Sequence, residues 1–468
     1  MKSIVDKITV PKWISCHTYL FGQEESRTYI SNEKLHTYVQ LDGITSDFWK
    51  LLYDKADCDT LSNFAQKHGI EEQIDDFINV LVEQQLLSYT DCKSKIECKN
   101  APMSNDESDA DLEQKFVEDM KKWLFEHKFL YSLFFELTYR CNLKCIHCYN
   151  PKHENDVEID FELCKRAIDE AYDIGCFHIT FSGGESLLHS RFYELVKYAR
   201  SKHISVEIFT NGQVLAKDEG LYEKIVKLYP HRIGVSLYST DGITHDKVTA
   251  VKGSFEKTNM LLQKMTSDNL NVQIKNFLLN CNCEDCVTVK NYAQKIGATS
   301  IADISLIPTI EGDKKTMQFA LNEEQLFTLY TDPESPLYID GDFKPLNIAD
   351  IDSMSPCLGG FTGLCVTPSA EVVICVSLPY SVGNLKQDSI KSIWQSAMEK
   401  KKDSKLYQWL EVTISDCTEC YKEDYCAFCN YCPGMGYLEN GYLKHSDVQC
   451  TQAKVKMRAY NYLKSIKK

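Results

Sequence analysis

The stretch that decides the fold is Leu137-Thr138-Tyr139-Arg140-Cys141-Asn142-Leu143-Lys144-Cys145-Ile146-His147-Cys148-Tyr149-Asn150, which continues an apolar run over 129–137. Its thiols have the spacing C-x3-C-x2-C. Cysteine thiolates are the usual protein ligands of iron–sulfur clusters, and three such ligands leave one iron of a four-iron cluster open for a small molecule. Thiolates also bind zinc, but a structural zinc site needs a fourth ligand. The spacing therefore favours an iron–sulfur cluster over zinc.

Composition indicates an ordinary soluble protein. The chain has 468 residues, 43% of them hydrophobic and 25% charged, and this length suggests about two to four domains. The net charge of −15 disfavours nucleic acid as a partner. The N-terminus has no apolar signal core, and no apolar run approaches the roughly 20 residues of a membrane helix. We therefore expect a cytoplasmic location, where 21 cysteines indicate metal or redox chemistry rather than disulfides.

Residues 114–315 alternate between strand-like and helical segments. The strand-like runs are 133–137, 177–181, 204–209, 233–238, 272–279 and 300–307. Helical periodicity between them predicts an α/β fold, with a parallel sheet and right-handed crossovers. Six such units are too few for an eight-stranded barrel. In barrels of this kind the chemistry lies at the carboxyl ends of the strands, and the three cysteines follow the first strand.

The cysteine spacing, the strand before it and the Cys148-Tyr149 ending together resemble the signature of the radical S-adenosylmethionine (SAM) enzymes. The resemblance implies a partial (β/α)6 barrel with a 4Fe-4S cluster on Cys141, Cys145 and Cys148. It implies that the open iron chelates SAM, and that one electron cleaves SAM to a 5′-deoxyadenosyl radical, which abstracts a substrate hydrogen. It also implies an external electron donor such as flavodoxin or ferredoxin.

A glycine pair followed by a carboxylate ends the second strand-like run, at Gly183-Gly184-Glu185. Adjacent glycines let the backbone approach a ligand closely, and a carboxylate accepts hydrogen bonds from an ammonium group. The segment resembles the motif that holds the methionine amino group of SAM in this family. The resemblance assigns further SAM contacts to Tyr149, Asn211, Ser236 and Ile307.

One position departs from the family pattern. Relatives carry an arginine for the SAM carboxylate before a Gly-Ser-Phe element, and Thr249 stands in that place here. Lys252 or Lys275 is the alternative cation, although a lysine cannot form the bidentate fork of an arginine. How the carboxylate is held is therefore open.

Residues 1–92 predict a small α/β unit, with strand-like runs at 15–22, 27–31 and 36–41 and three amphipathic helices after them. This order resembles the winged-helix recognition element of enzymes that modify ribosomally made peptides (RiPPs). The resemblance implies that the leader of a precursor peptide adds to the edge of this unit as an extra strand. A winged-helix unit used only for packing or dimerisation is the alternative. A polar, acidic linker over 93–113 follows.

The C-terminal region, 351–468, follows a bridge over 316–350 and is dense in cysteines. A predicted hairpin lies between its first cysteines, and the order of the rest resembles the SPASM domain, which binds auxiliary 4Fe-4S clusters. The resemblance implies one cluster on Cys417, Cys420 and Cys450, with Cys426 or Cys429. It implies a second cluster on Cys357, Cys375 and Cys432, with Cys365 as the candidate fourth ligand. Zinc ribbons are the alternative for such cysteine pairs.

Two features depart from the SPASM pattern. Ala370 stands where the pattern usually has glycine, and the run holds one cysteine more than expected, which leaves Cys426 and Cys429 as alternatives. A separate trio of thiols follows the fifth strand-like run. We expect ordinary thiols there because a structural metal site would need a fourth ligand. The trio is Cys281, Cys283 and Cys286.

These modules together predict a radical SAM oxidoreductase that matures a precursor peptide. The leader docks on residues 1–92, the core segment enters the barrel, and the deoxyadenosyl radical removes a hydrogen from it. The auxiliary clusters bind a substrate thiolate or accept the remaining electron. The favoured product is a cysteine thioether, with carbon–carbon cross-linking and sulfatase-type maturation as alternatives. A non-catalytic electron-transfer protein is the alternative of another class, which Glu185 and the open cysteine triad disfavour.

Overall fold

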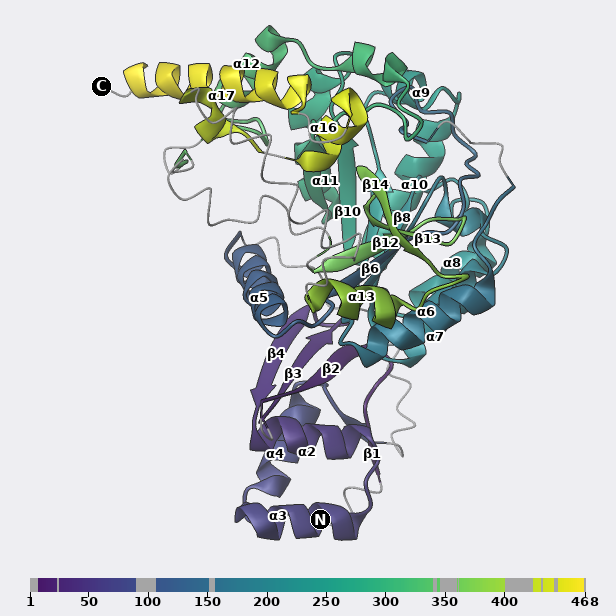
Figure 1. Ribbon diagram of the computed structural model, residues 1–468, viewed down its shortest axis with the longest axis vertical. Helices are drawn as coiled ribbons and strands as arrows, with labels where there is room; N and C mark the ends of the chain where they lie inside the picture. Colours follow the sequence, from purple (N-terminus) through teal and green to yellow (C-terminus); the bar gives the residue numbers. More distant parts are fainter. Residues whose placement is uncertain are drawn as a thin grey trace.

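A computed structural model of the chain describes residues 7–22, 25–89, 107–150, 156–339, 343–345, 360, 362–399, 424–430, 432–441 and 445–466. These residues form an N-terminal unit, a central barrel and a C-terminal unit (Figure 1). The N-terminal unit lies at one end of the molecule, and the C-terminal helices lie at the opposite end.

The centre of the molecule is a nine-stranded sheet in the order β11-β10-β9-β8-β7-β6-β12-β13-β14. The six strands that belong to the barrel are parallel to one another. They are β6 (Ser132–Glu136), β7 (His178–Ser182), β8 (Ser205–Thr210), β9 (Arg232–Ser236), β10 (Val272–Phe277) and β11 (Thr299–Asp303). Neighbours in this part of the sheet are also neighbours in the chain, so the predicted partial (β/α)6 barrel is confirmed.

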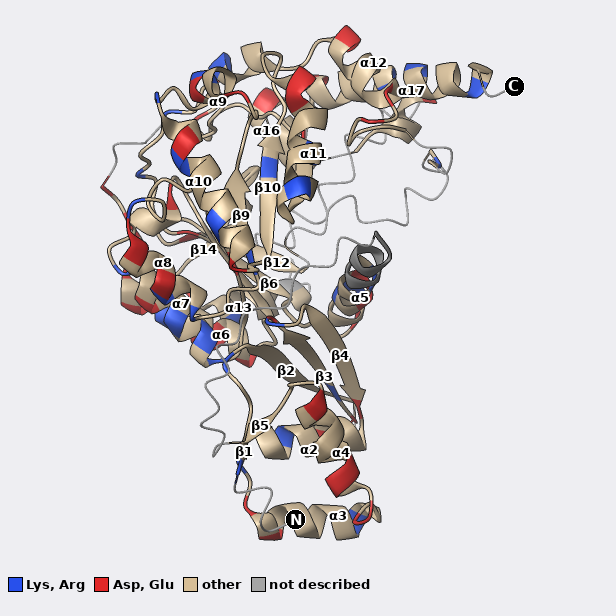
Figure 2. Cartoon of the chain, turned by 180° about the vertical axis from the view of Figure 1, so that it is seen from behind, with Lys and Arg blue, Asp and Glu red and all other residues tan. Residues whose placement is uncertain are grey.

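The helices of the barrel cover the outer face of this sheet. They are α6 (Phe161–Asp173), α7 (Phe192–Ser201), α8 (Glu219–Val226), α9 (Gly242–Thr249), α10 (Ser254–Ser267) and α11 (Cys286–Ile296). The helix α6 begins where the Asp160 side chain accepts a hydrogen bond from the backbone of Leu163 at 3.0 Å. Apolar strand residues such as Ile179 and Phe181 are buried beneath these helices. Charged residues gather on the outer helices (Figure 2).

The N-terminal unit has three antiparallel strands followed by three helices, as predicted. The strands are β2 (Ile14–Phe21), β3 (Glu25–Asn32) and β4 (Thr37–Asp42), and the helices are α2 (Ile44–Tyr53), α3 (Cys58–His68) and α4 (Ile74–Glu83). Two short strands, β1 (Ile8–Thr9) and β5 (Ser88–Tyr89), pair beside them. The helices pack on one face of the sheet around the buried Phe48 and Trp49.

This unit is docked at the amino ends of the barrel strands. The Cys16 backbone N–H donates to the carbonyl of His203, just before β8, at 2.8 Å. The Tyr19 hydroxyl donates to the carbonyl of Gly175, before β7, at 2.9 Å. The buried Glu33 carboxylate lies 2.8 Å from His231, before β9. The cysteine loop follows β6 at the opposite, carboxyl end of the strands.

A long helix, α5 (Glu107–Glu126), connects the N-terminal unit to the barrel. It includes residues 107–113, which the sequence assigned to a linker. Its Met120 and Leu124 pack with Tyr19 and Tyr29 on the face of the sheet opposite the three helices.

The C-terminal unit continues the barrel sheet. The strand β12 (Gly363–Val366) is parallel to β6, and β13 (Glu371–Cys375) and β14 (Leu378–Asn384) follow antiparallel. The predicted hairpin is therefore present in β12 and β13. Ala370 at its turn has φ +71°, the left-handed conformation that favours glycine. Its α-helices in the described residues are α12 (Glu323–Thr331), α13 (Ile390–Met398), α16 (Pro433–Asn440) and α17 (Asp447–Ile466).

Candidate functional site

The three cysteines of the motif lie in one loop at the carboxyl end of β6. The backbone N–H groups of Lys144 and Ile146 donate to carbonyls at the end of α9, at 3.1 and 3.0 Å, and so fix the loop. Burial, and then the neighbouring thiols, raise the pKa of Cys145. Burial also raises the pKa of Cys141 to about 12 and that of Cys148 to about 11.

These thiols fit an iron–sulfur cluster by their donor chemistry. Neighbouring buried thiolates repel one another, and burial disfavours their negative charge. A bound metal cation would stabilise the thiolate form of all three cysteines. In the part of the chain described, no group of three or more His, Cys, Asp or Glu side chains stands in position to hold a metal ion. The cluster ligands therefore stay a prediction.

The glycine pair interlocks with this loop. The backbone N–H of Gly184 donates to the Thr138 carbonyl at 2.7 Å, and that of Glu185 donates to the Arg140 carbonyl at 2.8 Å. A Cβ on Gly183 would lie 2.4 Å from the oxygen of Thr138, and one on Gly184 would lie 2.4 Å from the oxygen of Arg140. Gly183 also has φ +133°. Both positions therefore require glycine, and the two predicted motifs meet directly.

Glu185 is a buried carboxylate that faces the third strand. It accepts hydrogen bonds from the Thr210 hydroxyl and from the Asn211 backbone, each at 2.8 Å. Burial outweighs these bonds and raises its pKa to about 7. The Asn211 amide in turn donates to the Asn142 side chain at 2.7 Å and lies 3.7 Å from the Cys141 sulfur. The structure thus brings Glu185, Asn211 and the cysteine loop together.

Two other predicted SAM contacts, Tyr149 and Ile307, lie together at a different place. They pack against Met435 and Leu438 of α16 in the C-terminal unit. The Tyr149 hydroxyl donates to the buried carboxylate of Glu136. Their contact with SAM stays a prediction. Ser236 ends β9 on the inner face of the barrel, where it pairs in register with Lys275.

Sequence reasoning missed the buried groups around this loop. Glu136 receives hydrogen bonds from Tyr149 and Tyr139, and burial raises its pKa to about 7. The sequence feature that could have identified Glu136 is its position as a carboxylate at the end of an apolar strand. His147 stacks on Phe277 with ring centroids 5.0 Å apart, and burial lowers its pKa to about 4. The sequence offered no signal for that pairing.

Thr249, which replaces the expected arginine, has a structural role. Its hydroxyl bonds to the hydroxyl of Ser254 at 2.7 Å, and the side chain is buried. Lys252 lies on an exposed turn. Lys275, by contrast, lies on the inner face of the barrel, with its ammonium 4.4 Å from the centre of the Phe209 ring.

The predicted auxiliary ligands are described only in part. Cys357, Cys417 and Cys420 lie outside the described residues. Cys365 and Cys375 lie on β12 and β13, close enough that Cys375 contributes, after burial and Glu136, to the raised pKa of Cys365. The remaining thiols lie in or just after the short helix Asp424–Phe428, at the start of α16 and on α17. They are Cys426, Cys429, Cys432 and Cys450. Which of them bind iron stays a prediction.

The separate trio of thiols sits in an apolar environment. Cys283 and Cys286 are buried beside Leu278 and Leu329, and Cys281 packs near Leu279. Burial raises the pKa of Cys283 to about 11. Their role as ordinary thiols stays a prediction.

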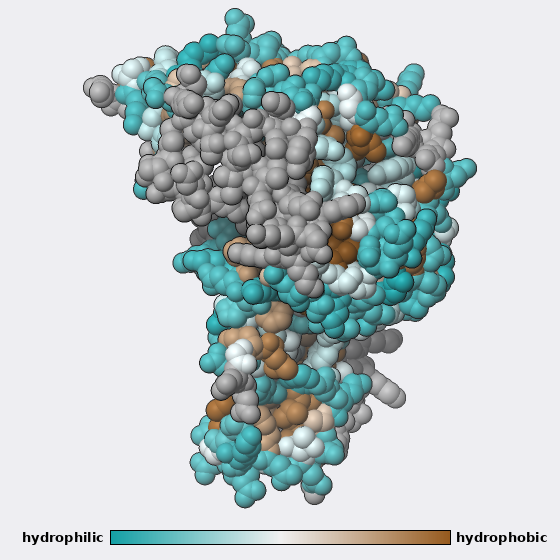
Figure 3. All heavy atoms as spheres, in the orientation of Figure 1, coloured by the Kyte–Doolittle hydropathy of each residue, from teal (hydrophilic) through white to brown (hydrophobic). Residues whose placement is uncertain are grey.

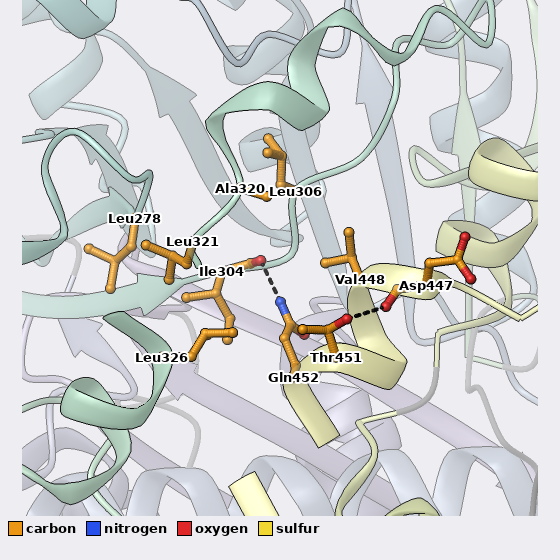
Figure 4. A pocket seen from close by; sticks show the side chains of 10 residues that line it. All are labelled: Leu278, Ile304, Leu306, Ala320, Leu321, Leu326, Asp447, Val448, Thr451 and Gln452. Atoms are coloured by element: carbon orange, nitrogen blue, oxygen red, sulfur yellow. Dashed lines mark hydrogen bonds between the residues drawn. The ribbon is translucent and has the colours of Figure 1, made fainter. Parts of the chain in front are cut away.

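An apolar cavity of about 210 Å³ lies between the ends of β10 and β11 and the helix α17 (Figure 4). Its lining includes Leu278, Leu306 and Val448, and Gln452 closes one side by donating to the Ile304 carbonyl at 3.0 Å. Binding sites for drug-sized ligands usually have roughly 300–1,000 Å³. The volume of this cavity lies below that range.

Comparison with known families agrees with this geometry. Residues 135–279 match the radical SAM superfamily, and residues 357–433 match SPASM, an iron–sulfur cluster-binding domain. The chain is therefore a protein with a radical SAM domain and a SPASM domain, and these domains imply SAM and 4Fe-4S clusters as cofactors.

The chain is, more particularly, homologous to peptide maturases. It is 27% identical over 329 residues to the antilisterial bacteriocin subtilosin biosynthesis protein AlbA of Bacillus subtilis, over 68% of this chain and 70% of AlbA. It is also 26% identical over 333 residues to the AdoMet-dependent heme synthase of Methanosarcina barkeri, over 65% of this chain and 93% of that protein.

A solved structure extends the likeness to the N-terminal unit. The crystal structure of Streptococcus suis SuiB bound to precursor peptide SuiA has a TM-score of 0.55 and 15% identity, over 94% of this chain and 99% of SuiB. The similarity confirms the fold of all three units, including that of the expected recognition element. In the described residues no helix is long and apolar enough to cross a membrane.

Proposed function

We propose that the protein is a radical SAM maturase that forms a cross-link in a ribosomally made precursor peptide. The observation that carries this proposal is the interlock between the cysteine loop and the glycine pair, in a chain that also has a docked winged-helix unit. A heme synthase activity, as in one relative, would leave that unit without a role. When bound, SAM and the cluster would supply a 5′-deoxyadenosyl radical.

In the described residues, the outer edge of β4 pairs with no further strand, and we propose it as the docking edge for the leader peptide. The β2 edge is bonded to the barrel through Cys16 and His203, whereas β4 is the opposite edge of the sheet. Just after β4, Ile44 at the start of α2 is 42% exposed. Hydrophobic residues are visible on this unit in Figure 3. A leader strand on β4 would gain backbone hydrogen bonds and apolar contacts.

The residues of the site divide into binding and electron-handling groups. Glu185 and the backbone of Gly183 and Gly184 are the groups that would hold the SAM amino end. The C-terminal cysteines would hold auxiliary clusters, beside which a substrate thiolate binds or an electron leaves. A thioether from a peptide cysteine is the favoured product because thiolates bind such clusters well. Carbon–carbon cross-linking is the alternative.

The test uses the full chain, reconstituted anaerobically with iron and sulfide. Reduced flavodoxin or dithionite, SAM and a synthetic cysteine-bearing candidate precursor peptide, chosen from any short reading frame next to the gene, are added. We expect 5′-deoxyadenosine and a peptide lighter by two hydrogens, whose cysteine no longer reacts with iodoacetamide. A lighter peptide with a reactive cysteine would favour carbon–carbon cross-linking. No 5′-deoxyadenosine, or a zinc-filled protein, would contradict the proposal.

A further inference from the structure

Two buried polar side chains from the ends of barrel strands reach the sulfurs of the cysteine loop. The Tyr238 hydroxyl, two residues beyond the end of β9, lies 3.9 Å from the Cys145 sulfur. The Asn211 amide nitrogen, directly after β8, lies 3.7 Å from the Cys141 sulfur. Sulfur is a large, weak acceptor, so its hydrogen bonds are longer than those of oxygen. Tyr238 and Asn211 are only 6% and 8% exposed, so water competes little for either bond.

Both side chains must act as donors once the thiols hold iron. A free thiol can donate to a tyrosine hydroxyl or accept from it, but an iron-bound thiolate has no proton and can only accept. The tyrosine hydroxyl then donates to Cys145. The amide group of Asn211 has two N–H donors. One of them serves the Asn142 side chain at 2.7 Å, which leaves the other for Cys141.

The position of Tyr238 does not depend on its bond to sulfur. Its backbone N–H donates to Nδ1 of His245 at 3.3 Å, and its carbonyl accepts from the Asn282 amide at 2.8 Å. Its ring makes an edge-to-face contact with the His147 ring, with 5.0 Å between the centroids. A phenylalanine in this place would keep all three contacts. Removal of the hydroxyl should therefore leave the ring and the loop where they are.

We infer that the Tyr238 hydroxyl and the Asn211 amide raise the reduction potential of the cluster on Cys141, Cys145 and Cys148. This inference rests on the proposed function, in which those cysteines hold the cluster with the open iron. One-electron reduction adds a negative charge to the cluster and its thiolates, and hydrogen-bond donors beside the sulfurs stabilise that charge. An external electron donor, which supplies the electron, therefore reduces the cluster more readily.

The test is a potentiometric titration of the full chain, reconstituted anaerobically with iron and sulfide. Dithionite and redox mediators set the potential, and electron paramagnetic resonance measures the reduced clusters. Each sample is divided, and SAM is added to one half immediately before freezing. The signal that SAM changes belongs to the cluster with the open iron, which distinguishes it from the signals of the auxiliary clusters.

Tyr238→Phe should lower the ratio of reduced to oxidised cluster about fivefold at the wild-type midpoint potential. This corresponds to the loss of one hydrogen bond of about 1 kcal/mol. Asn211→Ala should shift the ratio in the same direction. Tyr198→Phe is the matched control, because its hydroxyl donates to Asp169 at 2.7 Å on the outer helices α7 and α6. The ratio in this control should equal that of wild type.

Iron content separates an effect on the potential from a structural effect. All three variants should bind as much iron as wild type does. A Tyr238→Phe protein with about four fewer irons would show that the hydroxyl holds the loop together, and the inference would be wrong for this residue. The Asn211→Ala titration would still decide it for the amide, through a different strand and a different sulfur.

The remaining outcomes separate this inference from the proposed function. Equal midpoint potentials in wild type and both variants would overturn the inference alone, since the wild-type protein would still form 5′-deoxyadenosine. A wild-type protein without any signal that responds to SAM would overturn the proposed function, and the inference with it.

Discussion

Replacing Gly184 by alanine tests the interlock between the glycine pair and the cysteine loop. The new Cβ would lie 2.4 Å from the Arg140 oxygen and 2.5 Å from the Tyr139 oxygen. Both are backbone atoms, so no side-chain rotation relieves the overlap. The two segments must separate, and the 2.7 Å and 2.8 Å hydrogen bonds that join them are lost. Overpacking costs about 1–3 kcal/mol and each hydrogen bond about 1 kcal/mol, which gives about 3–5 kcal/mol.

The assay is thermal unfolding of the cluster-free protein, followed by iron analysis after anaerobic reconstitution. We expect Gly184→Ala to unfold several degrees below wild type and to bind about four fewer irons, because one cubane cluster depends on this loop. Gly220→Ala is the matched control. Gly220 lies in α8, with its nearest foreign atom 3.5 Å from the added Cβ. Alanine there should stabilise slightly. A Gly184→Ala protein with wild-type stability and iron content would refute the reasoning.

Three further substitutions test other parts of the structure. Glu33→Gln should lower the free energy of unfolding near pH 7 by about 3 kcal/mol. Burial alone would raise the pKa of Glu33, but His231 and other partners outweigh burial and lower this pKa from 4.5 to about 2, so the ionised carboxylate stabilises the folded state. That stabilisation is present above pH 4.5 and is lost toward pH 2, so urea titrations of variant and wild type should converge on acidification. Cys145→Ala should abolish 5′-deoxyadenosine formation, whereas Cys176→Ala, in the apolar core, should keep both iron and activity. Tyr19→Phe removes a 2.9 Å hydrogen bond to the barrel and should lower stability by about 1–2 kcal/mol, with faster proteolysis of the N-terminal unit.

Local sequence patterns predicted the barrel well because each strand carries its own signal. The apolar runs and the glycine pair are short-range features, and Gly183 stands where φ is +133°. Ala370 shows that residue type alone does not predict backbone conformation. It adopts the left-handed φ of +71° that is usual for glycine, so the turn survives at a cost of roughly 1 kcal/mol in strain.

The missed features depend on contacts between distant segments. Glu136 and Tyr149 are 13 residues apart, and their hydrogen bond requires the loop between them to fold back over the strand end. Ile307, to which the family resemblance assigns a contact with SAM, packs on α16, more than a hundred residues later in the chain. No period or spacing in the sequence encodes such a pairing.

If the leader docks on β4 as proposed, the placement of the N-terminal unit sets a lower limit on the substrate's length. The strands that separate its docking face from the cysteine loop have five or six residues, as in β6 and β10. They span roughly 17–20 Å, so an extended peptide needs at least about six residues between the segment on β4 and the modified residue. Stepwise deletion of this spacer should leave anisotropy-measured binding of the leader unchanged, since the β4 edge does not depend on it. Product formation, followed by mass spectrometry, should collapse once fewer than about six residues remain. A peptide that is modified at wild-type rate with a two-residue spacer would show that its leader docks elsewhere, because no extended chain of that length reaches from the amino ends of the strands to the cysteines.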